Sequence, residues 1–215
     1  MPRRAMETVL RLRVQGRLAF WLLRVRLVAA MSGSTVELDV HPTVRLGRNV
    51  RVQFDRGTRN RLVVGPRSNL RDDVILQLRG GSIEIGPDCD LRENCRINAT
   101  GRLVLAGKNV FGWACTVHSK ESVFVGEMTS CSEYVTIVDS RHFHSRDGGW
   151  FYANSESSPV EIGRNVWLAS KCTVMMGARI GDDCLVAASS VVGGIVEAGT
   201  VVAGIPARPI RSSFR

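Results

Sequence analysis

The stretch VEIGRNVWLASKCTVMMGARIGDDCLVAASSVVGGIV, residues 160–196, decides the fold because it repeats every six residues. Its aliphatic residues stand six apart: Ile162, Leu168, Val174, Ile180, Val186 and Val192. Four residues after each of the first five comes a small or β-branched residue: Val166, Cys172, Ala178, Cys184 and Ser190. A fixed short period of this kind indicates a solenoid, in which stacked turns bury one continuous core.

The pattern continues towards the N terminus when gaps are allowed. The further aliphatic positions are Val40, Leu46, Val52, Val64, Leu70, Leu76, Ile85, Leu91, Ile97, Leu105, Phe111, Val117, Val125, Cys131 and Ile137. Within each triplet the spacing is always six, and extra residues occur almost only after the third member. Three hexapeptides therefore form one turn of a triangular coil. We predict an all-β chain in which seven coils stack over residues 40–196.

The six-residue repeat also accounts for the positions of the six cysteines. Five of them occupy the small position, Cys89, Cys95, Cys115, Cys172 and Cys184, and Cys131 occupies an aliphatic one. We expect small buried hydrophobic residues with free thiols, rather than metal ligands, nucleophiles or disulfides.

The C-terminal segment VEIGRNVWLASKCTVMMGARIGDDCLVAASSVVGGIVEAGTVVAGIPARPIR resembles the ending of the galactoside, maltose and surface-glycan O-acetyltransferases. These are hexapeptide-repeat acyltransferases, and the likeness covers roughly residues 40–211. The resemblance implies a left-handed parallel β-helix and a homotrimer with clefts between adjacent prisms. It also implies direct transfer of an acetyl group from acetyl-CoA to a hydroxyl of a sugar or glycan precursor, with no metal.

The longest insertion, DSRHFHSRDGGWFYANSESSP over residues 139–159, interrupts the prism and is expected to carry the chemistry. Acyl transfer needs a base, and a neutral histidine is suited to this near pH 7. By resemblance we favour His142 as the base and Asp139 as its orienting residue, with His144 as the alternative. Trp150 in the same loop and His118, one coil earlier, are candidate acceptor-binding residues.

Other residues match the family's donor site. Trp167 matches the tryptophan beside the pantetheine arm, Ser170 a small polar residue, and Ala187 and Ala188 a Gly-Ala pair along the groove. Arg208 and Arg211 match basic residues near the nucleotide. The family often has Thr-Lys or Thr-Arg where this chain has Gly193 and Gly194, so one frequent phosphate contact is absent.

The first 30 residues hold seven arginines and one acid, Glu7, and so carry most of the net charge of +9. Residues 6–30 are expected to form one or two basic amphipathic helices. They would cap the open end of the β-helix or lie on an anionic membrane, and capping is favoured. Nucleic-acid binding is not expected, because no recognised motif accompanies the charge.

We therefore divide the chain into a helical arm and linker, residues 1–35, and an acyltransferase domain, residues 36–215, with a tail over 197–215. No secretory leader or membrane-spanning stretch is recognised, so we expect a cytoplasmic protein, peripheral to the membrane at most. Two alternatives stay open. One is a zinc enzyme of the carbonic anhydrase type using His118, His142 and His144, and the other is a non-catalytic scaffold.

Overall fold

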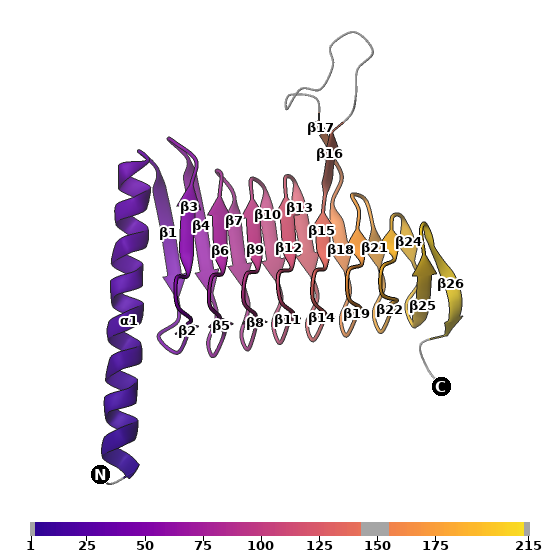
Figure 1. Ribbon diagram of the computed structural model, residues 1–215. Helices are drawn as coiled ribbons and strands as arrows, with labels where there is room; N and C mark the ends of the chain where they lie inside the picture. The colour runs from indigo at the N-terminus through magenta and orange to yellow at the C-terminus, as the bar shows by residue number, and fades with distance from the viewer. Residues whose placement is uncertain (1–2, 143–154, 213–215) are drawn as a thin grey trace.

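The computed structural model describes residues 3–142 and 155–212, with the side chains of residues 16–142 and 155–212. A single helix, α1 (Arg3–Met31), precedes a solenoid of short strands and lies along one of its ends (Figure 1). The hairpin β16–β17 projects from the side of the solenoid, and the chain ends at the opposite end from α1 (Figure 1).

Three sheets of parallel strands form the faces of the prism. The first sheet contains β1 (Thr35–Val40), β4 (Arg59–Val64), β7 (Ser82–Ile85), β10 (Arg102–Leu105), β13 (Ser122–Val125), β18 (Val160–Ile162), β21 (Arg179–Ile180) and β24 (Ile195–Val196). The second contains β2 (Arg45–Leu46), β5 (Asn69–Leu70), β8 (Asp90–Leu91), β11 (Val110–Phe111), β14 (Ser130–Cys131), β19 (Trp167–Leu168), β22 (Leu185–Val186) and β25 (Thr200–Gly204), to which β26 (Ala207–Ser212) adds antiparallel. The third contains β3 (Arg51–Phe54), β6 (Ile75–Leu78), β9 (Arg96–Ala99), β12 (Thr116–Ser119), β15 (Thr136–Val138), β20 (Thr173–Val174) and β23 (Val191–Val192).

Successive strands enter successive sheets, so each coil gives one strand to each face, and seven coils are complete. The pairing register confirms the repeat deduced from the sequence. Val40 pairs with Val64, Leu46 with Leu70 and Val52 with Leu76, and the same phase persists through Val174 and Val192. Each aliphatic side chain therefore stacks on its equivalent one coil away, which builds three apolar ladders inside the prism.

The small positions of the repeat are buried as expected. Val166, Cys172, Ala178, Cys184 and Ser190 are each at most 2% exposed. All six cysteines are buried and free, and burial raises the thiol pKa of Cys89 to about 11 and of Cys172 to about 12. The thiols of Cys89 and Cys172 therefore stay protonated at neutral pH and serve as small apolar residues.

Glycine serves two purposes at the corners: Gly177 adopts a left-handed backbone with φ of 74°, whereas Gly181 permits close packing of two coils. Gly181 does not have a positive φ, whereas its neighbours in the corner turns, Asn165 and Asp183, adopt φ of 54° and 60°. A Cβ on Gly181 would lie 2.6 Å from the backbone nitrogen of Ala198 in the next coil. Gly181 therefore allows adjacent coils to approach closely, and the left-handed positions at these two corners are filled by asparagine and aspartate.

The helix α1 caps the open end of the first coil. Leu18, Trp21 and Val25 join its core, Ala29 is also buried, and the Trp21 indole donates a hydrogen bond to the carbonyl of Val50 at 3.0 Å. The expected capping role is thus supported for residues 16–31. The helix is one continuous segment that begins before residue 6, and the first strand starts at Thr35, inside the expected linker. Among the described residues, no helix is long and apolar enough to cross a bilayer.

Candidate active site

The long insertion leaves the prism between the third and first sheets, after β15. Its two ends form a short antiparallel hairpin, β16 (Ser140–His142) and β17 (Ser155–Ser157), before the chain returns to β18. Arg141 and Glu156 form an ion pair across the hairpin. His142 is exposed, pairs with Ser155, and is the last described residue of β16. His144 and Trp150 lie outside the described residues.

Asp139 fixes the corner from which this hairpin departs. Its side chain is fully buried and accepts hydrogen bonds from the backbone N–H groups of Lys120, Glu121 and Ser122 at 2.7, 2.7 and 2.8 Å. Its own carbonyl accepts a bond from the backbone of Ser158 at 2.9 Å. The carboxylate thus binds the corner of the preceding coil, and orientation of His142 by Asp139 remains a prediction.

Lys120 holds the other strand of the hairpin. Its ammonium group donates to the carbonyl of Ser155 at 2.8 Å and also to the Ser155 hydroxyl. No motif in the sequence indicated Lys120. The coil register contained the necessary signal, because Lys120 lies two residues after His118, which pairs with Val138 at the end of β15. A lysine at that position is long enough to reach β17, the returning strand of the hairpin that is inserted in the next coil.

His118 lies on β12, one coil before the hairpin, and is exposed. Its Nδ1 is 3.4 Å from the amide nitrogen of Asn98 on the adjacent strand β9, which suits the tautomer protonated at Nε2. The pKa of His118 is lowered, first by partial desolvation and then by the charge of Arg79, while Asp139 opposes this shift. The imidazole is therefore neutral at pH 7 and can bond a hydroxyl group.

The predicted donor residues gather at a different corner, between the second and third sheets. Trp167 is exposed on β19, and its indole donates to the Ser132 hydroxyl at 3.1 Å. The Ser170 hydroxyl donates to Glu133 at 2.8 Å, and this bond lowers the pKa of the Glu133 carboxyl. Ser132 and Glu133 are neighbours of the site that the sequence did not indicate.

The remaining donor residues extend this surface towards the C-terminal end. Ala187 and Ala188 directly follow β22, one coil beyond Ser170. Trp167 pairs with Leu185, Leu185 with Val201, and Val201 with Arg211 on β26. Three strand spacings of about 4.8 Å place Arg211 about 14 Å along the sheet from Trp167. Arg208 is also on β26, opposite Ala203, and both arginines are exposed.

Within one prism, the corner that carries His142 lies on one side of the third sheet, and the corner that carries Ser170 lies on the other. They are separate features of the chain, and the donor surface continues along the second sheet rather than towards His142. The described residues contain no group of three or more histidine, cysteine, aspartate or glutamate side chains that could hold a metal ion.

Comparison with known proteins assigns the family. Residues 159–194 match the family described as bacterial transferase hexapeptide (six repeats). The chain is 34% identical over 141 residues to WbbJ of Escherichia coli (strain K12), which carries the name of a lipopolysaccharide biosynthesis O-acetyl transferase. This match covers 61% of the chain and 72% of WbbJ. The chain belongs to the hexapeptide-repeat acyltransferases.

Other proteins share less sequence identity with the chain. The galactoside O-acetyltransferase of Escherichia coli (strain K12) is 30% identical over 115 residues, which cover 52% of this chain and 55% of that protein. Among solved structures, the polysialic acid O-acetyltransferase OatWY superimposes with a TM-score of 0.66 at 16% identity, covering 83% and 85% of the two chains. The D94N mutant of the N-acyltransferase AntD from Bacillus cereus, in complex with dTDP and coenzyme A, gives 0.58 at 12% identity, covering 81% and 83%.

These superpositions agree with the fold expected for the family, the left-handed parallel β-helix. As a hexapeptide-repeat acyltransferase the protein is an enzyme, and the expectation drawn from the C-terminal motif is confirmed at that level.

Proposed function

We propose that this protein transfers an acetyl group from acetyl-CoA to a hydroxyl of a sugar or glycan precursor. The observation that carries the proposal is the hairpin fixed by Asp139 and Lys120, which presents His142 at a corner of an acyltransferase prism. The names of WbbJ and the galactoside enzyme support an O-linked sugar acceptor. The coenzyme A bound to the AntD mutant supports a coenzyme A thioester as the donor.

In this proposal His142 acts as the general base. It takes the proton of the acceptor hydroxyl while the hydroxyl oxygen attacks the thioester carbonyl, and the coenzyme A thiolate leaves. The cysteines are all buried in the prism and do not supply a nucleophile, so transfer is direct, in a ternary complex. His118, neutral and exposed one coil below, contacts the acceptor.

The donor lies along the second sheet. Trp167, Ser170, Ala187 and Ala188 border the pantetheine arm, and Arg208 and Arg211 meet the phosphates near the C-terminal end. Because this surface and His142 occupy different corners of one prism, the cleft is completed by an adjacent prism in a homotrimer. One chain supplies the base and its neighbour supplies the donor surface.

The test is thiol release from acetyl-CoA against a panel of sugars and nucleotide sugars. We expect His142→Ala to lower turnover by about 10²–10⁴-fold while the protein stays folded. His41→Ala is the matched control, because His41 is an exposed histidine on the first coil, and it should keep full turnover. Loss in His144→Ala alone would assign the base to His144. Full turnover in both His142→Ala and His144→Ala would refute the catalytic assignment.

A further inference from the structure

The helix α1 is apolar on two opposite sides, although capping the first coil uses only one of them. Each of the buried residues Leu18, Trp21, Val25 and Ala29 is followed two positions later by an exposed apolar residue. These are Phe20, Leu23, Leu27 and Met31, which are 63%, 53%, 53% and 85% exposed. Two residues correspond to about 200° around a helix, so the exposed set, here named the outer face, points away from the coils.

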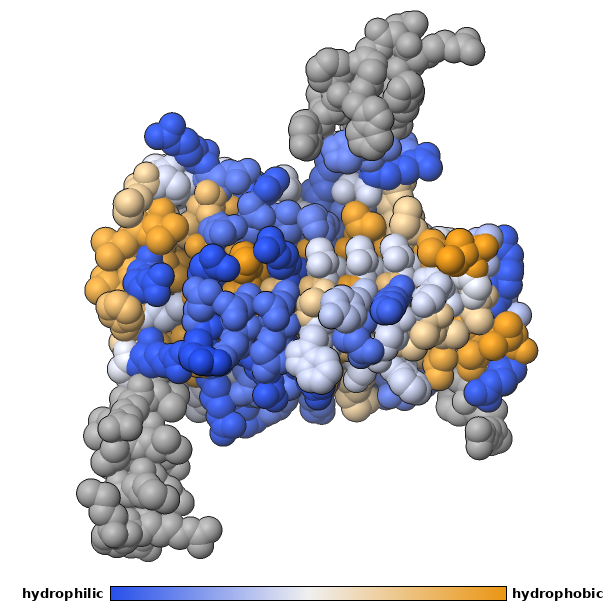
Figure 2. Space-filling view, in the orientation of Figure 1, coloured by the Kyte–Doolittle hydropathy of each residue, from blue (hydrophilic) through white to orange (hydrophobic). Residues whose placement is uncertain are grey.

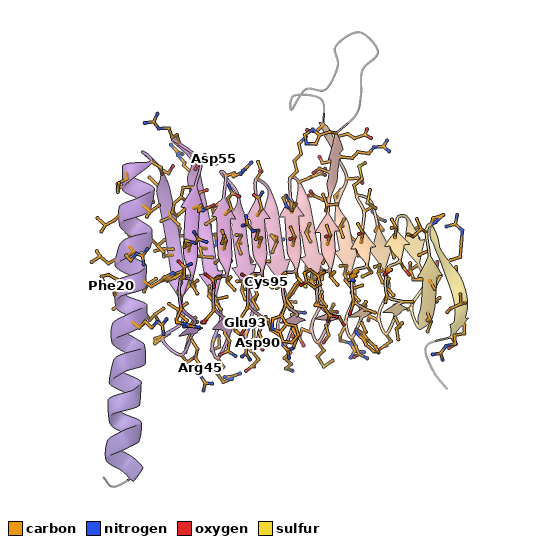
Figure 3. The ribbon with its side chains drawn as sticks, viewed as in Figure 1. Phe20, Arg45, Asp55, Asp90, Glu93 and Cys95 are labelled. Carbon is orange, nitrogen blue, oxygen red and sulfur yellow. The ribbon has the colours of Figure 1, made fainter. Side chains whose placement is uncertain are left out.

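The outer face is a continuous surface. Figure 2 shows hydrophobic side chains gathered over the α1 end of the molecule, and Figure 3 shows Phe20 on the side of the helix away from the strands. An exposed apolar patch rimmed by charged residues typically marks a contact with a partner or a membrane. Packing among the side chains of residues 16–142 and 155–212 does not account for it, because the core of the first coil is already covered by the opposite side of α1.

The charges beside the outer face indicate what kind of partner it binds. Arg24 and Arg26 lie on either side of the outer face, and residues 16–31 contain no acidic residue. Neither arginine forms an ion pair with any residue whose side chain the structure describes. Two copies of this face brought together would place like charges against each other, which opposes self-association. An apolar stripe bordered by arginines instead suits an interface that is both apolar and negatively charged.

A groove beside the outer face adds a place for a phosphate group. It runs between α1 and the first coil and is lined by Trp21, Arg24, Val25, Val28, Val50, Arg51, Val52 and Gln53. Arg24 from the helix and Arg51 from β3 both line this groove, and a guanidinium group matches the geometry of phosphate oxygens.

We propose that the outer face of α1 binds the surface of an anionic phospholipid bilayer. The helix lies parallel to the surface, Phe20, Leu23, Leu27 and Met31 enter the boundary between headgroups and acyl chains, and Arg24, Arg26 and Arg51 meet lipid phosphates. The prism then stands on the bilayer by its N-terminal end. This proposal concerns where the enzyme works and does not depend on the acceptor or on His142.

The experiment is co-sedimentation of the full chain with vesicles of phosphatidylcholine alone, or with about a quarter of phosphatidylglycerol. We expect binding to the anionic vesicles that weakens with salt, and little binding to the neutral ones. The double variant Leu23→Asp, Leu27→Asp should bind at least about tenfold more weakly. The control Ile195→Asp changes an apolar residue that is 73% exposed at the other end of the prism and should bind like the parent.

A second variant keeps the test decisive if the aspartates disturb folding, as judged by circular dichroism. Arg24→Glu with Arg26→Glu changes only exposed side chains and should abolish the preference for anionic vesicles. Equal binding to neutral and anionic vesicles, or unaltered binding by both double variants, would overturn the proposal. So would a change in oligomeric mass of the Leu23→Asp, Leu27→Asp protein in sedimentation velocity without lipid, because the face would then belong to a second copy.

Discussion

Asp139 shows how a single residue at the insertion can have a structural task as well as the expected chemical one. The motif suggested an aspartate that orients a histidine, and the structure gives its carboxylate three backbone N–H donors at the corner of the previous coil. A buried carboxylate needs such partners, because an unpaired charge inside a protein is costly. The same residue therefore supports the hairpin that carries His142.

Asp139→Ala should lower the free energy of unfolding by about 2–4 kcal/mol, because three backbone donors lose their acceptor. Urea denaturation measures this change. Glu161→Ala, which removes an exposed carboxylate on β18, is the control and should shift stability by less than about 0.5 kcal/mol. An Asp139→Ala protein as stable as the parent would show that these bonds contribute nothing.

The pKa of His118 lies below its ordinary value of 6.5 in the folded protein, owing to desolvation and Arg79. The unfolded chain therefore binds this proton more tightly than the folded one. As the pH falls through the unfolded value and towards the folded one, this group lowers stability; above the unfolded value its effect is absent. NMR titration should give a midpoint below 6.5, and Arg79→Gln should raise it. A midpoint at or above 6.5 in the parent would contradict the geometry.

Among the elements, α1 is the one whose role the sequence left open, and its packing explains why. Apolar residues recur at three- and four-residue spacings on more than one side, so periodicity alone cannot select the side that meets the coils. The first coil makes that selection, because it offers an open apolar end and a free carbonyl at Val50 for the Trp21 indole.

Trp21→Ala should destabilise the protein by about 3–5 kcal/mol, since a large buried ring and a hydrogen bond are lost together. Phe20→Ala, one residue earlier on the outer face, should change stability by less than about 0.5 kcal/mol in the absence of lipid. Thermal or urea unfolding of the two variants compares them directly. Similar losses in both would mean that α1 does not pack by the side containing Trp21.

At the scale of the whole molecule, the proposed trimer follows from the distance between the two proposed functional corners, which a second prism would bridge. His142 lies on the hairpin that projects between the third and first sheets. Trp167 and the surface that leads to Arg211 lie on the second sheet. In a cyclic trimer the same pair of unlike surfaces meets three times, so every cleft can be completed by two chains.

Mixed trimers test this arrangement. His142→Ala and Arg211→Ala chains, each with low activity alone, should regain up to about one quarter of the parent turnover when they are co-expressed in equal amounts. That share of clefts receives an intact histidine from one chain and an intact arginine from the other. Thiol release and light scattering give the activity and the mass. If mixed trimers form but regain no activity, both residues of an active cleft must come from the same chain.

The sequence by itself determined the prism, the phase of all 21 aliphatic positions, the burial of the cysteines and the place where an insertion interrupts the coils. These features follow from local, periodic packing, because each coil buries the same kinds of side chain as the coil before it. Only the tertiary structure decided which side of α1 is covered, that Lys120 holds Ser155, and that Asp139 binds the preceding corner. Those contacts join residues 17 to 35 positions apart, and their partners are selected by stacking geometry rather than by any motif.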